Sequence, residues 1–352
     1  MEAPVAIGDH ERVAQATTSY RIPAFDFTKG ALVLFMVLYH WLNYFYGPDG
    51  KIYTYLRFLT PSFILITGFL ISHVHIAKYG IGSPKLPGRL FTRGLKLIAV
   101  FVALNLMIGL FLPGSSVRTA VINHPSRAVL ESIFVTGNVF VGGVGRTASF
   151  GILVSIGYLL IVSAIVLIAC KFYRYGFHVL LGLLAICILV LDLHGRQTLI
   201  LEQLAVGVLG VVLGYASGSQ IQKLVQHPIA IIVAYCAYLA AITMWDAPYP
   251  MRLVGVCLTT LLIYMVGAIP GEAGTVRREI ILLGKYSLWG YIAQIAILQV
   301  LRAGYRHATL GVGAMTISFA LGVTLTIASV EFVDRARARS RIIDRLYRAV
   351  FA

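Results

Sequence analysis

The sequence predicts an all-α integral membrane protein, a polytopic bundle of about ten transmembrane helices. Of the 352 residues, 59% are hydrophobic and only 12% are charged, whereas about 25% are charged in an ordinary soluble domain. The mean hydropathy is +0.84. A soluble domain of this length cannot bury so much apolar surface in one core. The composition therefore argues against soluble enzymes, disordered chains and nucleic-acid-binding proteins.

Ten segments are apolar over the roughly 20 residues that a transmembrane helix needs. Turn-forming pairs such as Gly47-Pro48 mark many of the gaps between them. The longest connection is 113–149, and its apolar piece 131–143 is too short to span, which indicates an interfacial or re-entrant segment. The ten predicted spans are 27–46, 56–75, 91–112, 150–170, 177–194, 198–217, 228–245, 250–269, 280–301 and 309–333.

The distribution of positive charge predicts the orientation. Ten spans place both termini on one side, and that side carries about twice as many of the 29 lysines and arginines as the other. The positive-inside rule therefore predicts that the N-terminal segment 1–26 and the arginine-rich tail 334–352 are cytoplasmic and flank a transmembrane domain, 27–333. The tail is expected to lie on anionic lipid headgroups. The net charge of +15 then needs no nucleic-acid partner.

Ionisable side chains inside predicted spans are candidates for function, because they are costly in lipid. In the first span, Asp26, Lys29 and His40 fall on one helix face at 100° per residue, with His40 about 16 Å from Lys29 toward the extracytoplasmic side. This stripe predicts a functional site. Two structural alternatives are open: Asp26 and Lys29 simply form an ion pair, and His40 is a buried packing histidine.

Other polar residues fall at useful depths. Glu202 is predicted to lie level with His40, where a carboxylate can orient an imidazole or bind sugar hydroxyls, or else stay charged at the membrane interface. Asn43 is a second candidate to orient the ring. Glu331 is predicted to form a structural ion pair with Arg335 near the cytoplasmic boundary.

A basic cluster opens the third span. Arg89, Arg93 and Lys96 share one helix face on the predicted cytoplasmic side. Such a cluster suits a polyanionic phosphate ligand, but ordinary positive-inside charge is the simpler explanation. The four cysteines lie in apolar runs without zinc-ligand spacing, so no metal site is predicted.

The segment from Arg21 to His40 carries a motif. An arginine leads it, followed by Asp26, the pair Lys29-Gly30 and finally His40. This segment resembles the first helix of the acyltransferase family 3 superfamily, in which an Asp and an Arg-Gly pair precede a histidine. Lysine in place of the usual arginine loses the planar bidentate fork of a guanidinium.

Later stretches add to the resemblance. Residues 60–70 resemble a Phe-rich stretch of the family, and 283–291 resemble its Leu-Gly-x-x-Ser-Leu helix. Arg89 and Arg93 fall where the family has basic residues before its third helix. Gln294 stands where many members have a histidine, and glutamine cannot act as an acid or base. The chain is most similar to the single-domain branches, periplasmic-glucan succinyltransferases and, more distantly, heparan-glucosaminide acetyltransferases.

The resemblance implies an enzyme of the bacterial cytoplasmic membrane. It would move an acyl group, acetyl or succinyl, from cytoplasmic acyl-CoA to a hydroxyl or amine of an extracytoplasmic glycan or glycolipid. His40 is then expected to be the general base, or a transient carrier of the acyl group.

Binding roles follow from the same comparison. The phosphates of CoA are expected at Arg89, Arg93 and Lys96, and Lys29 with Asp26 is expected to hold the donor. Two other classes of function are open. A secondary transporter or flippase suits ten spans with central polar groups, whereas a structural subunit has little use for the polar stripe.

Overall fold

The computed structural model describes most of the chain outside its N-terminal segment. The described residues are 22–47, 52–112, 115–123, 126–139, 147–169, 175–196, 198–216, 218–245, 249–271, 274–305 and 311–351.

The described part of the chain is entirely helical, as the sequence predicts, and contains no strand. The α-helices are α2 (Pro23–Trp41), α3 (Ile52–Leu56), α4 (Leu59–Leu70), α5 (Ala77–Tyr79), α6 (Lys85–Phe111), α7 (Arg127–Glu131), α8 (Ile152–Ala169), α9 (Gly176–Leu193), α10 (Leu199–Leu213), α11 (Gly218–Val225), α12 (Pro228–Met244), α13 (Tyr249–Ala268), α14 (Thr275–Lys285), α15 (Ser287–Gly304), α16 (Val312–Arg339) and α17 (Arg341–Phe351). Four π-helical turns join them: η1 (Leu42–Tyr46), η2 (Ile71–Ile76), η3 (Arg118–Asn123) and η4 (Ser132–Thr136).

The helices identify an integral membrane protein. Within the described residues, seven helical segments are long and apolar enough to cross a membrane, and the bent pair α14–α15 makes up to eight. Two further apolar helices, α10 and α12, have fewer than 18 residues. Every one of the ten apolar segments therefore contains helix, while the count of ten crossings and the cytoplasmic position of both termini stay predictions.

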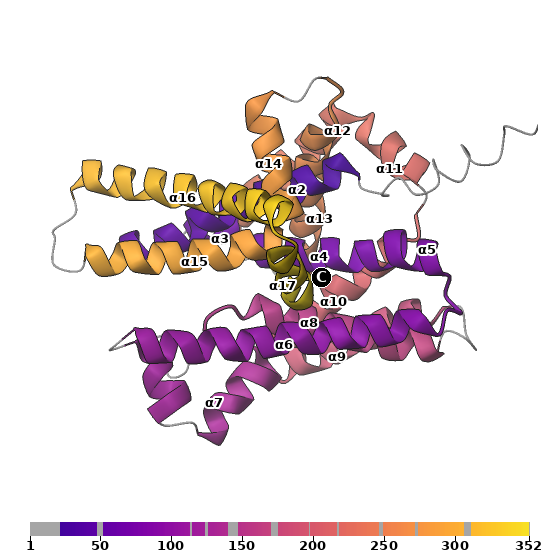
Figure 1. The fold of residues 1–352 in the computed structure, drawn as a ribbon. Coiled ribbons are helices and arrows are strands. Elements are labelled where there is room, and N and C mark those ends of the chain that lie inside the picture. Colours follow the sequence, from indigo (N-terminus) through magenta and orange to yellow (C-terminus); the bar gives the residue numbers. More distant parts are fainter. Residues whose placement is uncertain are drawn as a thin grey trace, which may run out of the picture.

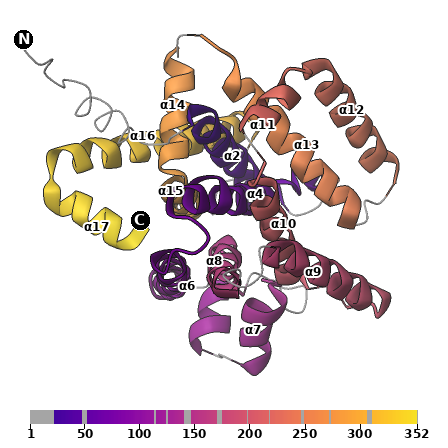
Figure 2. The same cartoon turned by 90° about the vertical axis from the view of Figure 1, so that its right-hand side faces the viewer.

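Helix α2 occupies the centre of the bundle. It contacts α4, α13, α14, α15 and α16, and Figure 2 shows α2 and α4 enclosed by α10, α13, α14 and α15. Leu32, Val33 and Val37 of α2 are fully buried. Because so many helices meet α2, its polar residues are necessarily placed inside the protein.

Glycines allow the central helices to approach closely. A Cβ atom on Gly30 of α2 would overlap the backbone of Ile280, and one on Gly284 of α14 would overlap the carbonyl of Asp26. The α4–α10 contact is of the same kind, with Gly68 against the backbone of Gly207. Small residues at such crossings are typical of membrane proteins, in which helix association depends on close packing.

The region predicted as one span, 280–301, is two helices that meet at 94°. Side-chain bonds fix the bend: the Tyr286 hydroxyl donates to Asp334 at 2.6 Å and the Lys285 ammonium at 3.0 Å. On the far side of the bend, Arg277 donates to the carbonyl of Gly267 at 2.9 Å. The prediction of a single helix is wrong here, because α14 is held by partners distant in sequence.

The C-terminal helix α17 folds back on α15 and α16 (Figure 1). Tyr347 packs against Tyr286, with ring centroids 5.5 Å apart, and Phe351 against Trp289 at 5.9 Å. Arg337 bonds the Asp344 carboxylate at 2.6 Å, which holds the pKa of that carboxyl below its usual range. The basic tail is therefore an amphipathic helix docked on the bundle.

Substituting Gly284→Ala tests the close contact between α2 and α14. The added methyl group has no space beside Asp26, so we expect a loss of stability on the order of 3 kcal/mol, as for other overpacked cores. Thermal unfolding in detergent measures it. The matched control is Gly182→Ala in α9, where a Cβ meets no atom within 4 Å. Equal melting temperatures for the two variants would contradict the packing.

Candidate functional site

His40 lies in the last turn of α2, directly before the π-helical turn η1. The residue is buried, with 8% of its surface exposed. Its ring stacks near Tyr44, at 6.1 Å between centroids, and lies 6.3 Å from Tyr291 of α15. His40 lines a cavity of about 230 Å³, here called the His40 cavity. A buried imidazole beside open space is placed to meet a bound molecule.

A strained backbone forms one wall of the His40 cavity. Phe150 is the single non-glycine residue at positive φ in the described chain, with φ at 62°, and its ring lies 6.0 Å from that of Tyr291. Asn105 of α6 holds the adjacent peptide: its amide donates to the Ser149 carbonyl at 2.9 Å and accepts from the Ser149 N–H at 2.7 Å. Strained backbone held by its surroundings is typical of functional sites.

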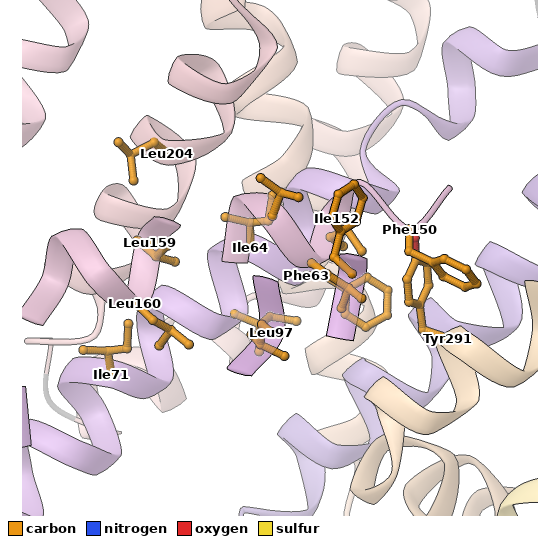
Figure 3. Packing of buried hydrophobic residues seen from close by; sticks show 14 of the residues in the cluster. Phe63, Ile64, Ile71, Leu97, Phe150, Ile152, Leu159, Leu160, Leu204 and Tyr291 are labelled. Carbon is orange, nitrogen blue, oxygen red and sulfur yellow. The ribbon is translucent and has the colours of Figure 1, made fainter. Parts of the chain in front are cut away.

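A second cavity, of about 170 Å³, adjoins the first on the side of Lys29. Lys29, His75 and Arg93 line it at one end, and Ile152 and Tyr291 line both this cavity and the His40 cavity. Figure 3 shows Ile152 beside Phe63, and Phe150 beside Tyr291. We call this space the Lys29 cavity, and its walls between the two ends are mostly apolar side chains.

A third and larger cavity, of about 680 Å³, is lined by the predicted basic cluster. Arg89, Arg93 and Lys96 all line it. The Arg89 guanidinium donates to the Tyr79 hydroxyl at 2.6 Å. This basic cavity shares His75 and Arg93 with the Lys29 cavity. The basic cavity, the Lys29 cavity and the His40 cavity therefore adjoin one another in that order.

Asp26 and Lys29 form an ion pair, with nitrogen and oxygen 2.6 Å apart. The structural alternative for these two residues is thus confirmed as a contact. Lys29 nevertheless lines a cavity, so the pair stands at the wall of the space that runs along α2. Glu331 and Arg335 also pair as expected, at 2.6 Å.

Three candidate residues are not among the described residues that line the His40 cavity. The Asn43 amide donates to the carbonyl of Tyr39 at 3.2 Å, and Asn43 is absent from the described lining of the His40 cavity. Gln294 is fully buried, and its amide has no hydrogen-bond partner among the described residues. Glu202 pairs with Arg252 at 3.5 Å in a neighbouring cavity.

Several residues in the walls of the His40 cavity were not predicted as site residues from the sequence. Ser155 and Gln203 are hydrogen-bonded to each other, and both line the His40 cavity. Asn105 is visible in the sequence as a lone amide in an apolar run, but its partner Ser149 is distant along the chain. Phe150 gives no sequence signal, because its positive φ is a property of the fold.

Replacing Asn105 with alanine tests the support of the cavity wall. The N–H and carbonyl of Ser149 lose their bonds inside the protein, and unsatisfied buried groups of this kind cost about 1–3 kcal/mol each. We expect a lower melting temperature and loss of any ligand binding in the His40 cavity. Asn123→Ala, at an exposed position of η3, is the control. Unchanged melting of Asn105→Ala would exclude the bracing role.

The chain was compared with family models, with curated proteins and with solved structures. It matches none of them. The likeness to the acyltransferase family 3 superfamily therefore rests on the residues quoted above, and the site is interpreted from its own geometry.

Proposed function

We propose that this protein is an acyl-CoA-dependent acyltransferase of the acyltransferase family 3 type. The observation that carries the proposal is the order of the three adjoining cavities, from a basic cavity through a mostly apolar one to a buried imidazole. Acyl-CoA has the same order of chemistry, with phosphates at one end, a long arm and a reactive thioester at the other. The donor would be an acetyl or succinyl thioester.

The donor's phosphates are assigned to Arg89, Arg93 and Lys96 in the basic cavity. Arginine binds phosphate through two parallel hydrogen bonds, and lysine adds a compact charge. The pantetheine arm would pass Lys29 in the next cavity. The axial rise from Lys29 to His40 is about 16 Å, a span suited to an extended pantetheine arm.

In the reaction, His40 acts as general base. It takes the proton of the acceptor hydroxyl while the acceptor oxygen attacks the thioester carbonyl carbon. The carbon–sulfur bond then breaks, and the CoA thiolate leaves and receives the proton. Imidazole suits this role because its ordinary pKa lies close to physiological pH. A variant route first transfers the acyl group to the imidazole, and trapping of an acylated histidine distinguishes the two.

The proposal includes the setting of the enzyme. Ten spans with cytoplasmic termini would place the basic cavity on the side where acyl-CoA is made. The acceptor would be a glycan or glycolipid outside a bacterial cytoplasmic membrane. Membrane lipids surround the bundle, which carries many exposed apolar side chains such as Phe111, Leu193 and Phe332.

A secondary transporter is the second candidate, and one observation favours it. The α14–α15 pair is bent by 94° next to the central helix, and broken helices are typical of transporter binding sites. Thermal stabilisation by acetyl-CoA or succinyl-CoA separates the two functions, since a ligand stabilises the fold that binds it. Stabilisation supports the transferase, and its absence with both donors supports transport.

Substituting His40→Ala tests the catalytic step. Loss of a general base lowers turnover by roughly 100- to 10,000-fold, so we expect acyl transfer to fall by that factor while acyl-CoA still stabilises the protein. Release of free CoA during turnover in vesicles is the measurement. The control is His227→Ala, at an exposed position. Full activity of the His40 variant would overturn the assignment.

A double substitution, Arg89→Gln with Lys96→Gln, tests the phosphate site. Both side chains line the basic cavity, and only acyl-CoA, not acyl-pantetheine, carries the nucleotide phosphates. We expect the KM for acyl-CoA to rise roughly tenfold, about 1.4 kcal/mol, with no change for acyl-pantetheine. Lys78→Gln, at an exposed position outside the lining of that cavity, is the control. An equal effect on both donors would contradict phosphate binding.

A further inference from the structure

A fourth cavity, of about 300 Å³, lies beside the His40 cavity. Residues from the N-terminal ends of α4, α10 and α13 and from the C-terminal half of α12 line it. Tyr39, Thr60 and Gln203 line both this cavity and the His40 cavity. We call it the Glu202 cavity. Because only shared side chains separate the two spaces, a molecule in the Glu202 cavity lies next to the imidazole's cavity.

An ion pair lies in the wall of the Glu202 cavity. The Glu202 carboxylate is 3.5 Å from the Arg252 guanidinium, and 13% and 32% of these side chains are exposed. The Tyr249 hydroxyl donates to the backbone carbonyl of Glu202 at 2.8 Å. The Arg252 guanidinium also lies over the Tyr249 ring, 5.7 Å from its centre. Such groups are rare and costly at membrane depth, so their presence indicates a function.

The Glu202 and Arg252 side chains can form more hydrogen bonds than the single contact between them uses. A carboxylate accepts about four hydrogen bonds and a guanidinium donates five, whereas one contact at 3.5 Å joins them. The Arg252 Nε is buried without a hydrogen-bond partner among the described residues. The cavity therefore offers acceptors and donors side by side, on a wall that also carries tyrosine rings.

Tyr238 of α12 also lines the cavity, beside a glycine of α13 that leaves space for its ring. Its ring and hydroxyl occupy the position that a Cβ on Gly255 of α13 would fill. Tyr238 and Tyr249 thus both line the cavity that holds Glu202. Apolar ring faces beside a carboxylate and a guanidinium match a ring that has C–H faces and a hydroxylated edge.

We propose that the Glu202 cavity is the site that binds a sugar unit of the acceptor. Adjacent hydroxyls of a sugar would donate to Glu202 and accept from Arg252, while a tyrosine ring covers one sugar face. A lipid phosphate fits less well, because the negative Glu202 carboxylate beside Arg252 would repel it. Arg57, exposed on the wall of the same cavity, supplies a further donor. The acceptor role rests on the proposed acyl transfer, whereas sugar binding itself does not.

The position of the Glu202 cavity indicates the side from which an acceptor would reach His40. A hydroxyl of the bound sugar would cross the boundary formed by Tyr39 and Gln203 to reach the His40 cavity. Gln203 is fixed there by its hydrogen bond to Ser155. The thioester would enter from the opposite end of the same cavity, past Ile152 and Tyr291. Donor and acceptor therefore meet at the imidazole from two sides.

Saturation-transfer NMR tests the site without requiring turnover. The full chain in phosphatidylcholine nanodiscs is titrated with the methyl glycosides of glucose, galactose, N-acetylglucosamine and glucuronic acid. We expect saturation of at least one glycoside by the wild type. Glu202→Gln and Arg252→Gln should each weaken that glycoside's binding roughly tenfold, as expected for loss of a charge-assisted hydrogen bond. The matched controls are Glu131→Gln and Arg127→Gln on α7, both exposed.

The outcomes separate the two proposals. Saturation that the two cavity variants lose and the two controls keep supports the sugar site. Absence of saturation with every glycoside, or equal signals from all variants, overturns it. Tyr249→Phe removes one hydroxyl from the cavity and serves as a third variant if a charge substitution lowers the melting temperature. Glycoside binding without stabilisation by acyl-CoA would uphold the sugar site and reject the acyltransferase.

Discussion

The close contact between α2 and α14 determines where the polar stripe of α2, from Asp26 to His40, lies. Gly30 and Gly284 bring the two backbones together, so α2 is held at the centre of the bundle, where α4, α13, α15 and α16 also contact it. A side chain larger than hydrogen at either position would move α2 away from α14. The Lys29 cavity and the His40 cavity lie along α2, from Lys29 near its start to His40 at its end. Two glycines thus position the helix that carries both residues.

The cost of charge in a membrane explains how the site is built. Within the described segments, the carboxylates of Asp26, Glu202 and Asp334 each lie within 4 Å of a cationic group. Pairing reduces the desolvation cost of each charge but does not remove it. Replacing a buried ion pair with hydrophobic residues of similar volume often leaves the protein equally stable. Such pairs therefore need a reason other than stability. Two of the three line cavities, through Lys29 and through Glu202 with Arg252.

The sequence predicted what depends on local spacing and missed what depends on distant contacts. The helical period placed Lys29 and His40 on one face of α2, and both line adjoining cavities. The bend at Tyr286 depends on Asp334 in another helix, and no local pattern reveals such a partner. Glu202 was predicted level with His40 and lines a cavity that shares side chains with the His40 cavity, yet its partner Arg252 becomes visible only when α10 and α13 pack together. Hydropathy alone also leaves the length of each helix open. In the described chain, seven or eight helical segments are long and apolar enough to be candidate spans.

The two-sided approach to His40 bears on how a group crosses a membrane. A transporter moves a whole molecule through one site that opens to each side in turn. Here separate cavities meet the His40 cavity at different walls, one through Ile152 and Tyr291 and one through Tyr39 and Gln203. In the proposed transfer, with the donor held in one cavity and the acceptor in the other, only the acyl group would have to pass the imidazole. Neither CoA nor the sugar then needs to cross, and the bundle can keep its tightly packed centre throughout.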